Sequence, residues 1–357
     1  MIKSIKRFLY PITSKIFLHA RLVEGRLKGS GDSFRCLFVD NLDFTKILEA
    51  RIYEGAPIIH KSWRIFIPSL RKLLVNSDNA FDACVAALPM SYEPLFKNLY
   101  TYKSREKVRQ IIDISGTWDD VRKRFSKNKH QITNKFPEKF GLGYRISNDI
   151  NDFDHFYHRM FVPHIKKRYG ELAVIESYEN MKEYFLKGLL LFVTKNDERL
   201  AAALCLIANG VLIFRRTGVL DGNETLVESG AQTALYYYQL KYAHEMGLRA
   251  VDAMMSLPFL NDGVYMHKKE WGAAVFPDDE QSTWVYYFSA GLPEKTACFF
   301  EKNFVIVESD DGLRGVIGLP NTTDLSKETI DQLIHKYQAK GINGFFVHTK
   351  TGVLHIP

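Results

Sequence analysis

The most informative stretch of the chain is Ala250–Val275, AVDAMMSLPFLNDGVYMHKKEWGAAV. A short, mainly apolar strand at 250–255 opens it, and a polar Asn-Asp-Gly turn follows. A short helix over 262–271 then carries Lys268 and Lys269. A buried strand followed by a polar turn and a basic helix puts charged side chains at the carboxyl edge of a sheet. In open α/β sheets this edge is where ligands bind.

Length and composition indicate a globular protein of about two domains. The chain has 357 residues, of which 46% are hydrophobic and 13% aromatic, enough to build a large core. No apolar run reaches the roughly 20 residues of a membrane span, and the N-terminal stretch lacks a signal-peptide pattern. Four widely spaced cysteines lack metal-ligand spacing, so we expect a reducing, cytoplasmic location and no metal site: Cys36, Cys84, Cys205 and Cys298.

Positive charge is concentrated in the N-terminal part of the chain. Residues 1–145 hold 27 lysines and arginines against 14 aspartates and glutamates, whereas the remainder holds 21 against 27. This asymmetry indicates an anionic partner such as a membrane surface, a nucleic acid or a phosphate-rich ligand, or else a basic surface without a specific partner. Residues 1–28 are basic and partly amphipathic. They are expected either to lie on an anionic lipid surface at the inner face of the membrane or to form a packing helix.

Hydrophobic periodicity predicts a regular order of elements from residue 108 onward. Residues 29–110 are harder to read and show short strand-like runs at 34–39 and 80–88. The expected elements are a strand at 108–114, a helix at 117–125, a strand at 141–147, helices at 152–170 and 177–186, strands at 189–195, 200–208 and 211–220, a helix at 228–246, a strand at 250–255, a helix at 262–271 and a strand at 283–289. This order predicts an α+β fold in which the strands before and after the helix at 228–246 are parallel.

Three segments within this order resemble the GNAT acetyltransferase fold, and more narrowly its Fem-type branch. They are the run Ile111-Ile112-Asp113-Ile114-Ser115 with the basic helix to Lys135, the helix end Arg168-Tyr169-Gly170-Glu171, and Lys268-Lys269-Glu270-Trp271-Gly272-Ala273, which is similar to the family's Lys-x-x-aromatic-Gly ending.

The resemblance implies a GNAT-like sheet, mixed but largely antiparallel, flanked by helices and carrying N-terminal and C-terminal additions. The implied divisions are a basic segment at 1–28, an α/β region at 29–110 that is a degenerate first GNAT-like unit or a different domain, an acyltransferase domain at 111–290, and a β-α-β extension at 291–357.

The same resemblance implies an acyl donor as co-substrate and no covalently bound cofactor. In the GNAT family the loop after the fourth strand and the start of the next helix hold the pyrophosphate of acyl-CoA. Here that loop lacks the family's Arg/Gln-x-x-Gly-x-Gly/Ala signature, and Fem-type proteins without it use aminoacyl-tRNA, so both donors stay open. A nucleic-acid partner is expected only with the latter. The implied donor-binding residues are Arg216, Thr217, Gly218, Ser229, Gly230 and Ala231.

Lys268 and Asp252 are the main catalytic candidates, each with a structural alternative. Lys268 can stabilise the oxyanion of acyl transfer or lie on a solvated helix face. Asp252 can act as a base, or pair with Arg215 or Arg216 on the neighbouring strand. Tyr169, at the end of the long helix, is the third catalytic candidate. The candidates for acceptor binding are Arg168, Arg215, Ser256 and Lys269.

These features together predict an acyltransferase acting by direct attack of an amine or hydroxyl on acyl-CoA or aminoacyl-tRNA. By the resemblance, the acceptor is an envelope or polysaccharide precursor. The alternative is a non-catalytic protein of the same fold that binds a membrane or a nucleic acid.

Overall fold

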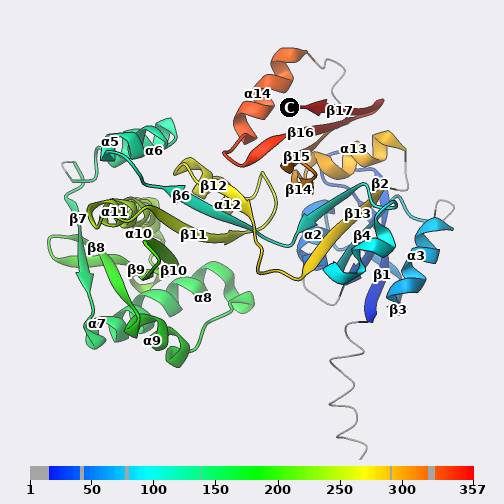
Figure 1. The fold of residues 1–357 in the computed structure, drawn as a ribbon. Helices are drawn as coiled ribbons and strands as arrows, with labels where there is room; N and C mark the ends of the chain where they lie inside the picture. Colours follow the sequence, from blue (N-terminus) through cyan, green and yellow to red (C-terminus); the bar gives the residue numbers. More distant parts are fainter. Residues whose placement is uncertain (1–15, 41–43, 77–79, 138, 290–291, 321–325) are drawn as a thin grey trace, which may run out of the picture. The chain divides into compact units, whose positions relative to one another are not determined.

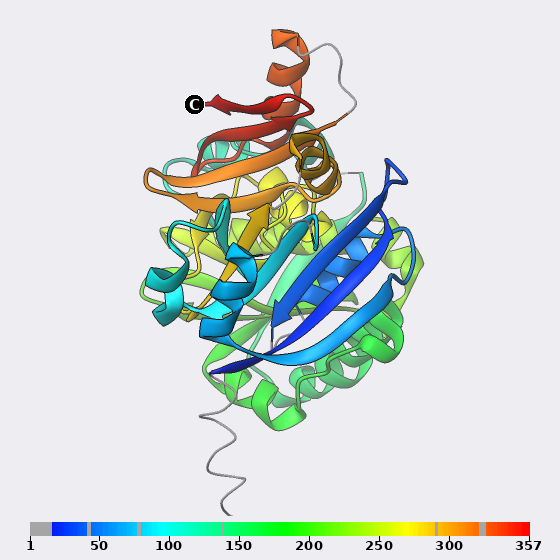
Figure 2. The same ribbon diagram turned by 90° about the vertical axis from the view of Figure 1, so that its right-hand side faces the viewer.

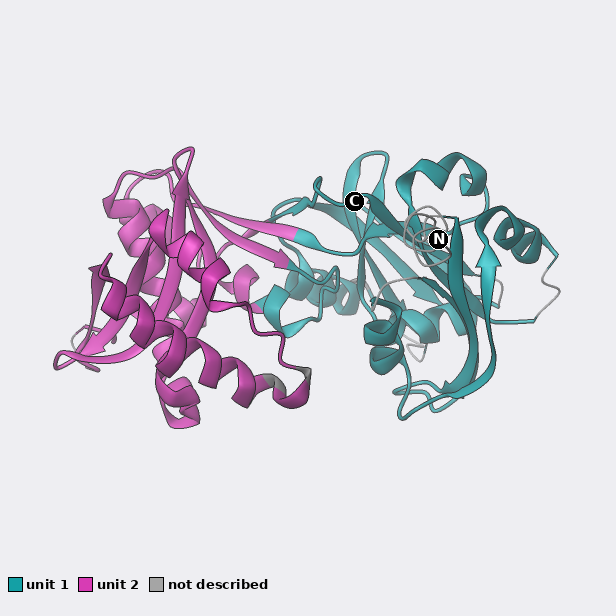
Figure 3. Ribbon diagram, turned by 90° about the horizontal axis from the view of Figure 1, so that it is seen from below, with its two compact units in different colours: residues 1–108, 256–266, 275–357 teal, residues 109–255, 267–274 magenta. Residues whose placement is uncertain are grey.

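The computed structural model divides into two compact units. It describes residues 1–357 except 1–15, 41–43, 77–79, 138, 290–291 and 321–325. Unit 2 comprises residues 109–255 and 267–274, and unit 1 comprises the rest (Figure 3). The structure therefore draws the boundaries differently from the predicted 29–110, 111–290 and 291–357, because residues up to 108 fold in one unit with residues 256–266 and 275–357.

Unit 2 contains most of the elements that periodicity predicts, with similar bounds (Figure 1). In chain order they are β6 (Val108–Asp113), α5 (Trp118–Lys123), α6 (Lys127–Thr133), β7 (Leu142–Ser147), α7 (Ile150–His155), the π-helical turn η2 (Phe156–Phe161), α8 (Val162–Tyr169), η3 (Gly170–Leu172), α9 (Tyr178–Leu186), β8 (Gly188–Lys195), β9 (Glu198–Ala208), β10 (Val211–Val219), η4 (Leu220–Gly222), α10 (Glu224–Glu228), α11 (Ala231–Glu245), β11 (Ala250–Ser256), α12 (Gly263–Glu270) and β12 (Ala274–Pro277).

The strands of this unit belong to a seven-stranded sheet in the order β12-β6-β11-β10-β9-β8-β7, in which β12 is part of unit 2 by Ala274 alone. The run β7-β8-β9-β10 is antiparallel throughout, whereas β10 and β11 are parallel and joined by α11. This confirms the predicted fold class, a mixed and largely antiparallel sheet flanked by helices, and the predicted crossover.

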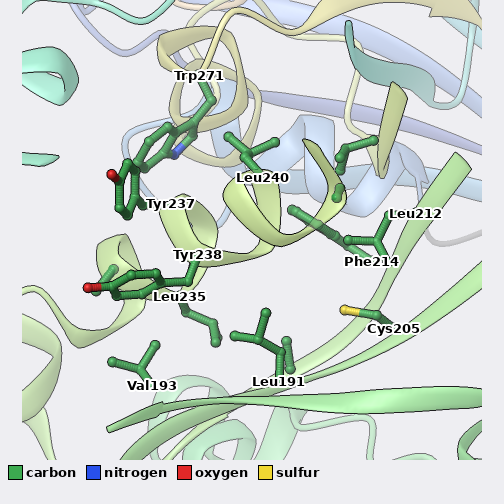
Figure 4. Packing of buried hydrophobic residues seen from close by; sticks show 14 of the residues in the cluster. Leu191, Val193, Cys205, Leu212, Phe214, Leu235, Tyr237, Tyr238, Leu240 and Trp271 are labelled. Atoms are coloured by element: carbon green, nitrogen blue, oxygen red, sulfur yellow. The ribbon is translucent and has the colours of Figure 1, made fainter. Parts of the chain in front are cut away.

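Two hydrophobic cores cover the two faces of the sheet. On one face, apolar side chains of the strands pack against α11, with Leu191, Cys205 and Leu212 facing Leu235 and its neighbours (Figure 4). On the other face, aromatic residues of α7, η2 and α9 pack against β8 and β9. Because the helices of the second core cover only this part of the sheet, the face formed by β10, β11 and β6 carries half-buried side chains.

Unit 1 is built on a ten-stranded sheet in the order β17-β16-β15-β14-β5-β13-β4-β2-β1-β3. Strands β2 and β4 are parallel within it. Its elements are β1 (Phe17–Arg26), β2 (Ser33–Asp40), α2 (Phe44–Ile52), β3 (Ile58–Phe66), α3 (Ile67–Val75), β4 (Ala83–Pro89), η1 (Met90–Tyr92), α4 (Glu93–Phe96), β5 (Tyr102–Arg105), β13 (Thr283–Ser289), α13 (Pro293–Glu301), β14 (Val305–Ser309), β15 (Gly312–Leu319), α14 (Lys327–Tyr337), β16 (Ile342–Thr349) and β17 (Gly352–Ile356).

Two expectations are corrected by this arrangement. The strand at 283–289 does not complete the sheet of unit 2, because as β13 it pairs with β4 and β5 in unit 1. Of the basic segment 1–28, residues 1–15 lie outside the described part, and from Phe17 the chain is strand β1, not a helix. Among the described residues, no helix is long and apolar enough to cross a bilayer.

Candidate active site

The strands β10 and β11 pair only over their first residues and then separate. Their parallel register runs from Val211 opposite Ala250 to Ile213 opposite Asp252, after which β10 continues to Val219 paired with β9 alone. A β-bulge at Arg215 accompanies the separation. The two parallel strands thus leave a gap at their carboxyl ends, and in open sheets ligands bind outside this end of the strands.

Asp252 is buried at the start of this gap and is held by an arginine. The Nε and Nη2 atoms of Arg109, on β6, donate to its Oδ2 at 2.9 and 2.6 Å. Its Oδ1 accepts the backbone N–H of Met254 at 2.8 Å, and Met254 has the left-handed φ of 65°. Asp252 therefore pairs with an arginine as expected, but with Arg109 and not with the predicted Arg215 or Arg216. An ion-paired carboxylate is poorly suited to act as a base.

Lys268 is only 4% exposed, so it does not lie on a solvated helix face. Its Nζ donates to the backbone carbonyl oxygens of Met254 and Met255, at 3.1 and 2.8 Å. The ammonium thereby ties helix α12 to the end of β11, where Met254 has its unusual backbone conformation. Lys268 consequently fixes the shape of the gap.

Aromatic rings fill the space between α11 and α12 beside the gap. The Tyr236 ring lies 4.6 Å from that of His267 and 5.1 Å from that of Phe214, centroid to centroid. Burial, with help from nearby cations, lowers the pKa of His267 to about 4, so its imidazole is neutral at pH 7. Its Nε2 accepts a hydrogen bond from Nε1 of Trp271 at 3.3 Å. Burial raises the pKa of Tyr236 to about 12 and Arg168 opposes that rise, which indicates that the guanidinium lies near this ring.

The Trp271-Gly272 ending of the family-like motif has a structural explanation. Trp271 is fully buried in the core beside Phe125, with ring centroids 5.1 Å apart. Gly272 has a φ of 80°, and a Cβ there would lie 2.9 Å from both Cβ and the carbonyl oxygen of Arg124. Only glycine fits this close, left-handed position. The motif therefore fixes the end of α12, which holds Lys268 in place.

A cavity of about 370 Å³ opens at the N-terminal end of α11. It is the place where the resemblance expects the acyl donor, between the loop after β10 and helix α8. The first N–H groups of α11 have no side-chain cap, because the residue before them is Gly230. The lining residues are His164, Lys167 and Arg168 of α8, Gly222 of η4, Glu224, Val227 and Glu228 of α10, and Gln232 of α11.

The charges of this cavity are balanced. Lys167 and Arg168 face Glu224 and Glu228, and Lys167 Nζ lies 3.9 Å from Glu224 Oε1. His164 is buried, and its burial together with the positive charge of Arg168 lowers its pKa, which keeps it neutral at pH 7. The cavity thus combines a neutral imidazole, paired charges and the positive end of a helix dipole.

Arg215 and Arg216 make separate structural contacts. The guanidinium of Arg215 lies over the Tyr184 ring, 4.0 Å from its centroid. Arg216 Nη2 lies 2.6 Å from Glu176 Oε2, and its Nη1 donates to the carbonyl of Arg215. Neither residue lines the cavity.

The predicted donor-binding residues are spread over two places. Gly218 packs against the backbone of η2, since a Cβ there would lie 2.5 Å from the carbonyl carbon of Met160. Thr217 precedes it on β10. The other three are at the start of α11 beside the cavity: Ser229, whose hydroxyl donates to Leu226 O at 3.0 Å, Gly230, and the buried Ala231.

Of the remaining predicted residues, Arg168 lines the cavity. Burial lowers the pKa of Lys269, which follows Lys268 on α12. Ser256 is buried as the last residue of β11, and the division between the two units falls directly before it. Tyr169 is the last residue of α8, and its side chain lies outside the described part. No cluster of histidine, cysteine, aspartate or glutamate suited to a metal ion is found in the described residues.

Sequence reasoning gave no role to Tyr236, His267 or Arg109 at this site. Tyr236 stands in a run of tyrosines interpreted as core, and Tyr237 and Tyr238 are indeed buried. A helical spacing of four residues from Gln232 would have placed Tyr236 on the cavity side of α11. His164 and Arg168 are likewise four residues apart on α8. This spacing is the local signal in the sequence that their side chains lie on the same face of the helix.

Comparison with known proteins finds similarity in structure only. No protein-family model and no curated protein matches the sequence. Solved structures that are similar include FemX (12% identity, TM-score 0.39, covering 75% of this chain and 84% of that one) and L-PGS from Bacillus licheniformis (11%, 0.38, 78% and 87%). A GCN5-related N-acetyltransferase from Kribbella flavida is also similar (14%, 0.28, 81% and 95%). At these identities and TM-scores the similarity says nothing about substrate or mechanism.

Proposed function

We propose that unit 2 is an acyltransferase domain that moves an acyl or aminoacyl group from acyl-CoA or aminoacyl-tRNA to an amine or hydroxyl. The observation that carries the proposal is the cavity at the start of α11, lined by α8 and by the segment that follows β10. A donor whose reactive end enters this cavity would place its carbonyl among the side chains that line it. The uncapped N–H groups of α11 favour a negatively charged or polar group there.

The charges that line the cavity favour the aminoacyl ester over the thioester. Glu224 and Glu228 oppose a pyrophosphate, and Lys167 and Arg168 offset them. The α-ammonium of an aminoacyl group, in contrast, is attracted by a carboxylate. We therefore infer that an aminoacyl donor is the better fit, with acyl-CoA as the second candidate.

The reaction would be a direct transfer. The acceptor nitrogen or oxygen attacks the donor carbonyl, the tetrahedral oxyanion collapses, and the thiol of CoA or the ribose hydroxyl of the tRNA leaves. His164 is neutral and lines the cavity, so it can take the proton released by the acceptor and pass it to the departing sulfur or oxygen. Arg168 offers a positive charge to the developing oxyanion. Asp252 and Lys268 are positioning residues in this scheme, since both are occupied by protein contacts.

The acceptor is proposed by resemblance alone. Fem-type relatives act on cell-envelope precursors, so an amine-bearing or hydroxyl-bearing envelope or polysaccharide precursor is the proposed class. Such a reaction would take place in the cytoplasm, at or near the inner face of the membrane.

Thermal unfolding with a panel of acyl-CoA thioesters and aminoacyl-tRNAs tests the proposal. A bound donor should raise Tm, and the rise should be largest with an aminoacyl-tRNA. Arg168→Ala should remove most of the rise. Lys166→Ala is the matched control, because Lys166 is an exposed cation on the same helix that does not line the cavity. A rise that both variants keep, or no rise with any donor, would favour a non-catalytic binding protein.

A further inference from the structure

Helix α6 of unit 2 has an exposed face made only of lysine, asparagine and glutamine side chains. The five exposed residues lie at helical spacing along the helix and at its carboxyl end: Lys127, Asn128, Gln131, Asn134 and Lys135. We call these five residues the α6 face. Neither of its lysines forms an ion pair with a residue that the structure describes. Their charge is therefore available to a partner.

The stability of α6 does not account for these two lysines. Lys129 serves the fold, since its Nζ lies 3.3 Å from Glu270 Oε2 and 5.4 Å from the centroid of the Trp271 ring. Lys127, in contrast, is the first residue of the helix, where the helix dipole disfavours a cation. Lys135 follows the helix and has no such contact. The placement of these two cations is thus better explained by an anionic ligand than by folding.

Acidic residues near the α6 face do not cancel its charge. Those nearest in the chain are Asp113, Asp119 and Asp120 before it and Glu138 after it, and Glu138 lies outside the described part. Asp113 lies 3.4 Å from Arg124, and Asp120 lies 3.2 Å from Lys123. Residues 113–139 hold seven lysines and arginines against four aspartates and glutamates, so the segment stays positive even when Glu270 is also counted.

The α6 face is held beside the start of α11, where the cavity opens. Arg122 Nη2 donates to Asn134 Oδ1 and thereby ties α5 to the end of α6 (Figure 1). Phe136 packs against the residue that precedes α11, because a Cβ at Gly230 would lie 4.0 Å from its Cε1. The Phe136 ring also lies 5.6 Å from that of Tyr237 on α11. A large ligand that extends out of the cavity therefore meets the α6 face as a neighbouring surface.

We propose that the α6 face binds the phosphate backbone of an RNA. Resting on the transfer function proposed above, this RNA is the body of the aminoacyl-tRNA donor whose reactive end enters the cavity. Lysine, asparagine and glutamine side chains contact phosphates and sugars of nucleic acids without reading their sequence. An anionic bilayer fits less well, because none of the five residues is apolar and able to enter the boundary between headgroups and acyl chains.

Binding of fluorescently labelled, unacylated bulk tRNA to the full chain, measured over a range of salt concentrations, tests the proposal. The affinity of the wild-type protein should fall steeply as salt rises. Lys127→Gln combined with Lys135→Gln should weaken binding roughly tenfold at physiological salt. The slope of log affinity against log salt should become shallower by about 2, one for each lost phosphate contact. Both lysines are exposed, so Tm should stay at the wild-type value.

The matched control is Lys61→Gln combined with Lys187→Gln, which also removes two exposed lysines. Lys61 is on strand β3 of unit 1, which runs beside β1 in Figure 2. Lys187 follows α9, which packs on the face of the unit 2 sheet opposite to that of Phe136. This variant should keep the wild-type tRNA affinity and the wild-type salt slope.

Several outcomes would overturn the proposal. They are no tRNA binding by the wild-type protein, an equal loss in both double variants, or wild-type affinity in the Lys127 and Lys135 variant. Tighter binding to phosphatidylglycerol vesicles than to tRNA, lost in that same variant, would assign the face to lipid instead.

Failure of the transfer function gives a different result. If tRNA binds through the two lysines but no donor raises Tm in a manner that depends on Arg168, the α6 face stands as an RNA surface and the transfer function fails. If Arg168→Ala removes a donor-induced rise in Tm while the Lys127 and Lys135 variant keeps its tRNA affinity, the inference about the α6 face is wrong and the transfer function stands.

Discussion

Arg109 holds Asp252 through two nitrogens on one carboxylate oxygen, at 2.9 and 2.6 Å, although the two residues are 143 positions apart in the chain. The pair bridges β6 and β11, and the carboxylate is almost completely buried. It thereby fixes the strand that borders the gap between β10 and β11.

Removing the arginine should destabilise unit 2. Arg109→Leu leaves a buried carboxylate without its charged partner, which costs about 3 kcal/mol. Because Arg109 is partly exposed, water will replace some of the lost contact. Urea unfolding of the variant and of Asp252→Asn measures the effect, and the double variant should lose less than the sum of the two single changes. Strict additivity of the two losses would show that the pair does not contribute as a unit.

Asp252→Asn separates a positioning role from a catalytic one. Asparagine keeps the shape of the side chain and can still accept the N–H of Met254, so transfer activity should fall only modestly, about as much as stability does. If Asp252 were the base, activity would drop by about 10²-fold or more in a protein that is still folded at the assay temperature.

Lys268→Met should loosen the end of β11. The variant fills similar space but removes the donor to the carbonyls of Met254 and Met255, and two buried carbonyls without a partner cost roughly 2 kcal/mol or more. We expect a lower Tm and weaker donor binding together. Lys187→Met, an exposed lysine at the end of α9, should change neither. Full stability combined with lost donor binding would instead make Lys268 a ligand contact.

The sequence pattern predicted those features of the fold that depend on residues close together in the chain. The crossover β10-α11-β11 and the bounds of α12 follow from apolar spacing, the Asn-Gly turn and the glycine stops, and the structure confirms them. The ion pair of Asp252 was predicted in kind, because a buried carboxylate requires a partner. Its identity was not, because Arg109 becomes a neighbour only through a sheet order that puts β6 beside β11.

The local sequence pattern also could not predict which sheet each strand joins. The apolar run at 283–289 was correctly predicted to be a strand, but alternation does not tell which sheet a strand joins. Its pairing with β4, some 200 residues earlier in the chain, unites the two ends of the chain in unit 1. For the same reason the region 29–110 was hard to interpret alone, since it shares its core with residues near 300.

Acid should destabilise unit 1 through His348. This residue is buried, its Nε2 lies 2.7 Å from the Tyr102 hydroxyl, and burial lowers its pKa to about 4. In the unfolded chain its pKa is near 6.5, so between pH 6.5 and 4 the unfolded state binds more protons. Stability is therefore fully present above pH 6.5 and falls by about 3 kcal/mol as the pH drops to 4.

Denaturant unfolding at pH 7 and pH 4.5 measures that loss. His348→Gln should be less stable at pH 7 but should lose less on acidification than the parent protein. His335→Gln, which changes an exposed histidine of α14, is the control and should show the parental pH dependence. A parental pH dependence in His348→Gln would assign the acid sensitivity to other groups.

Gly218→Ala distinguishes packing from donor binding at the end of β10. A Cβ at this position would lie 2.5 Å from the carbonyl carbon of Met160 and 2.6 Å from the N atom of Phe161, so β10 and η2 must move apart. Overpacking of this kind costs about 1 to 3 kcal/mol, and we expect Tm to drop by several degrees whether or not a donor is present.

Gly230→Ala, at the left-handed residue before α11, should also lower Tm through backbone strain, but it alters the rim of the cavity. Donor titrations below both transition temperatures should therefore show weaker binding in Gly230→Ala and near-parental affinity in Gly218→Ala. The reverse order would put the donor beside Gly218 and away from the start of α11.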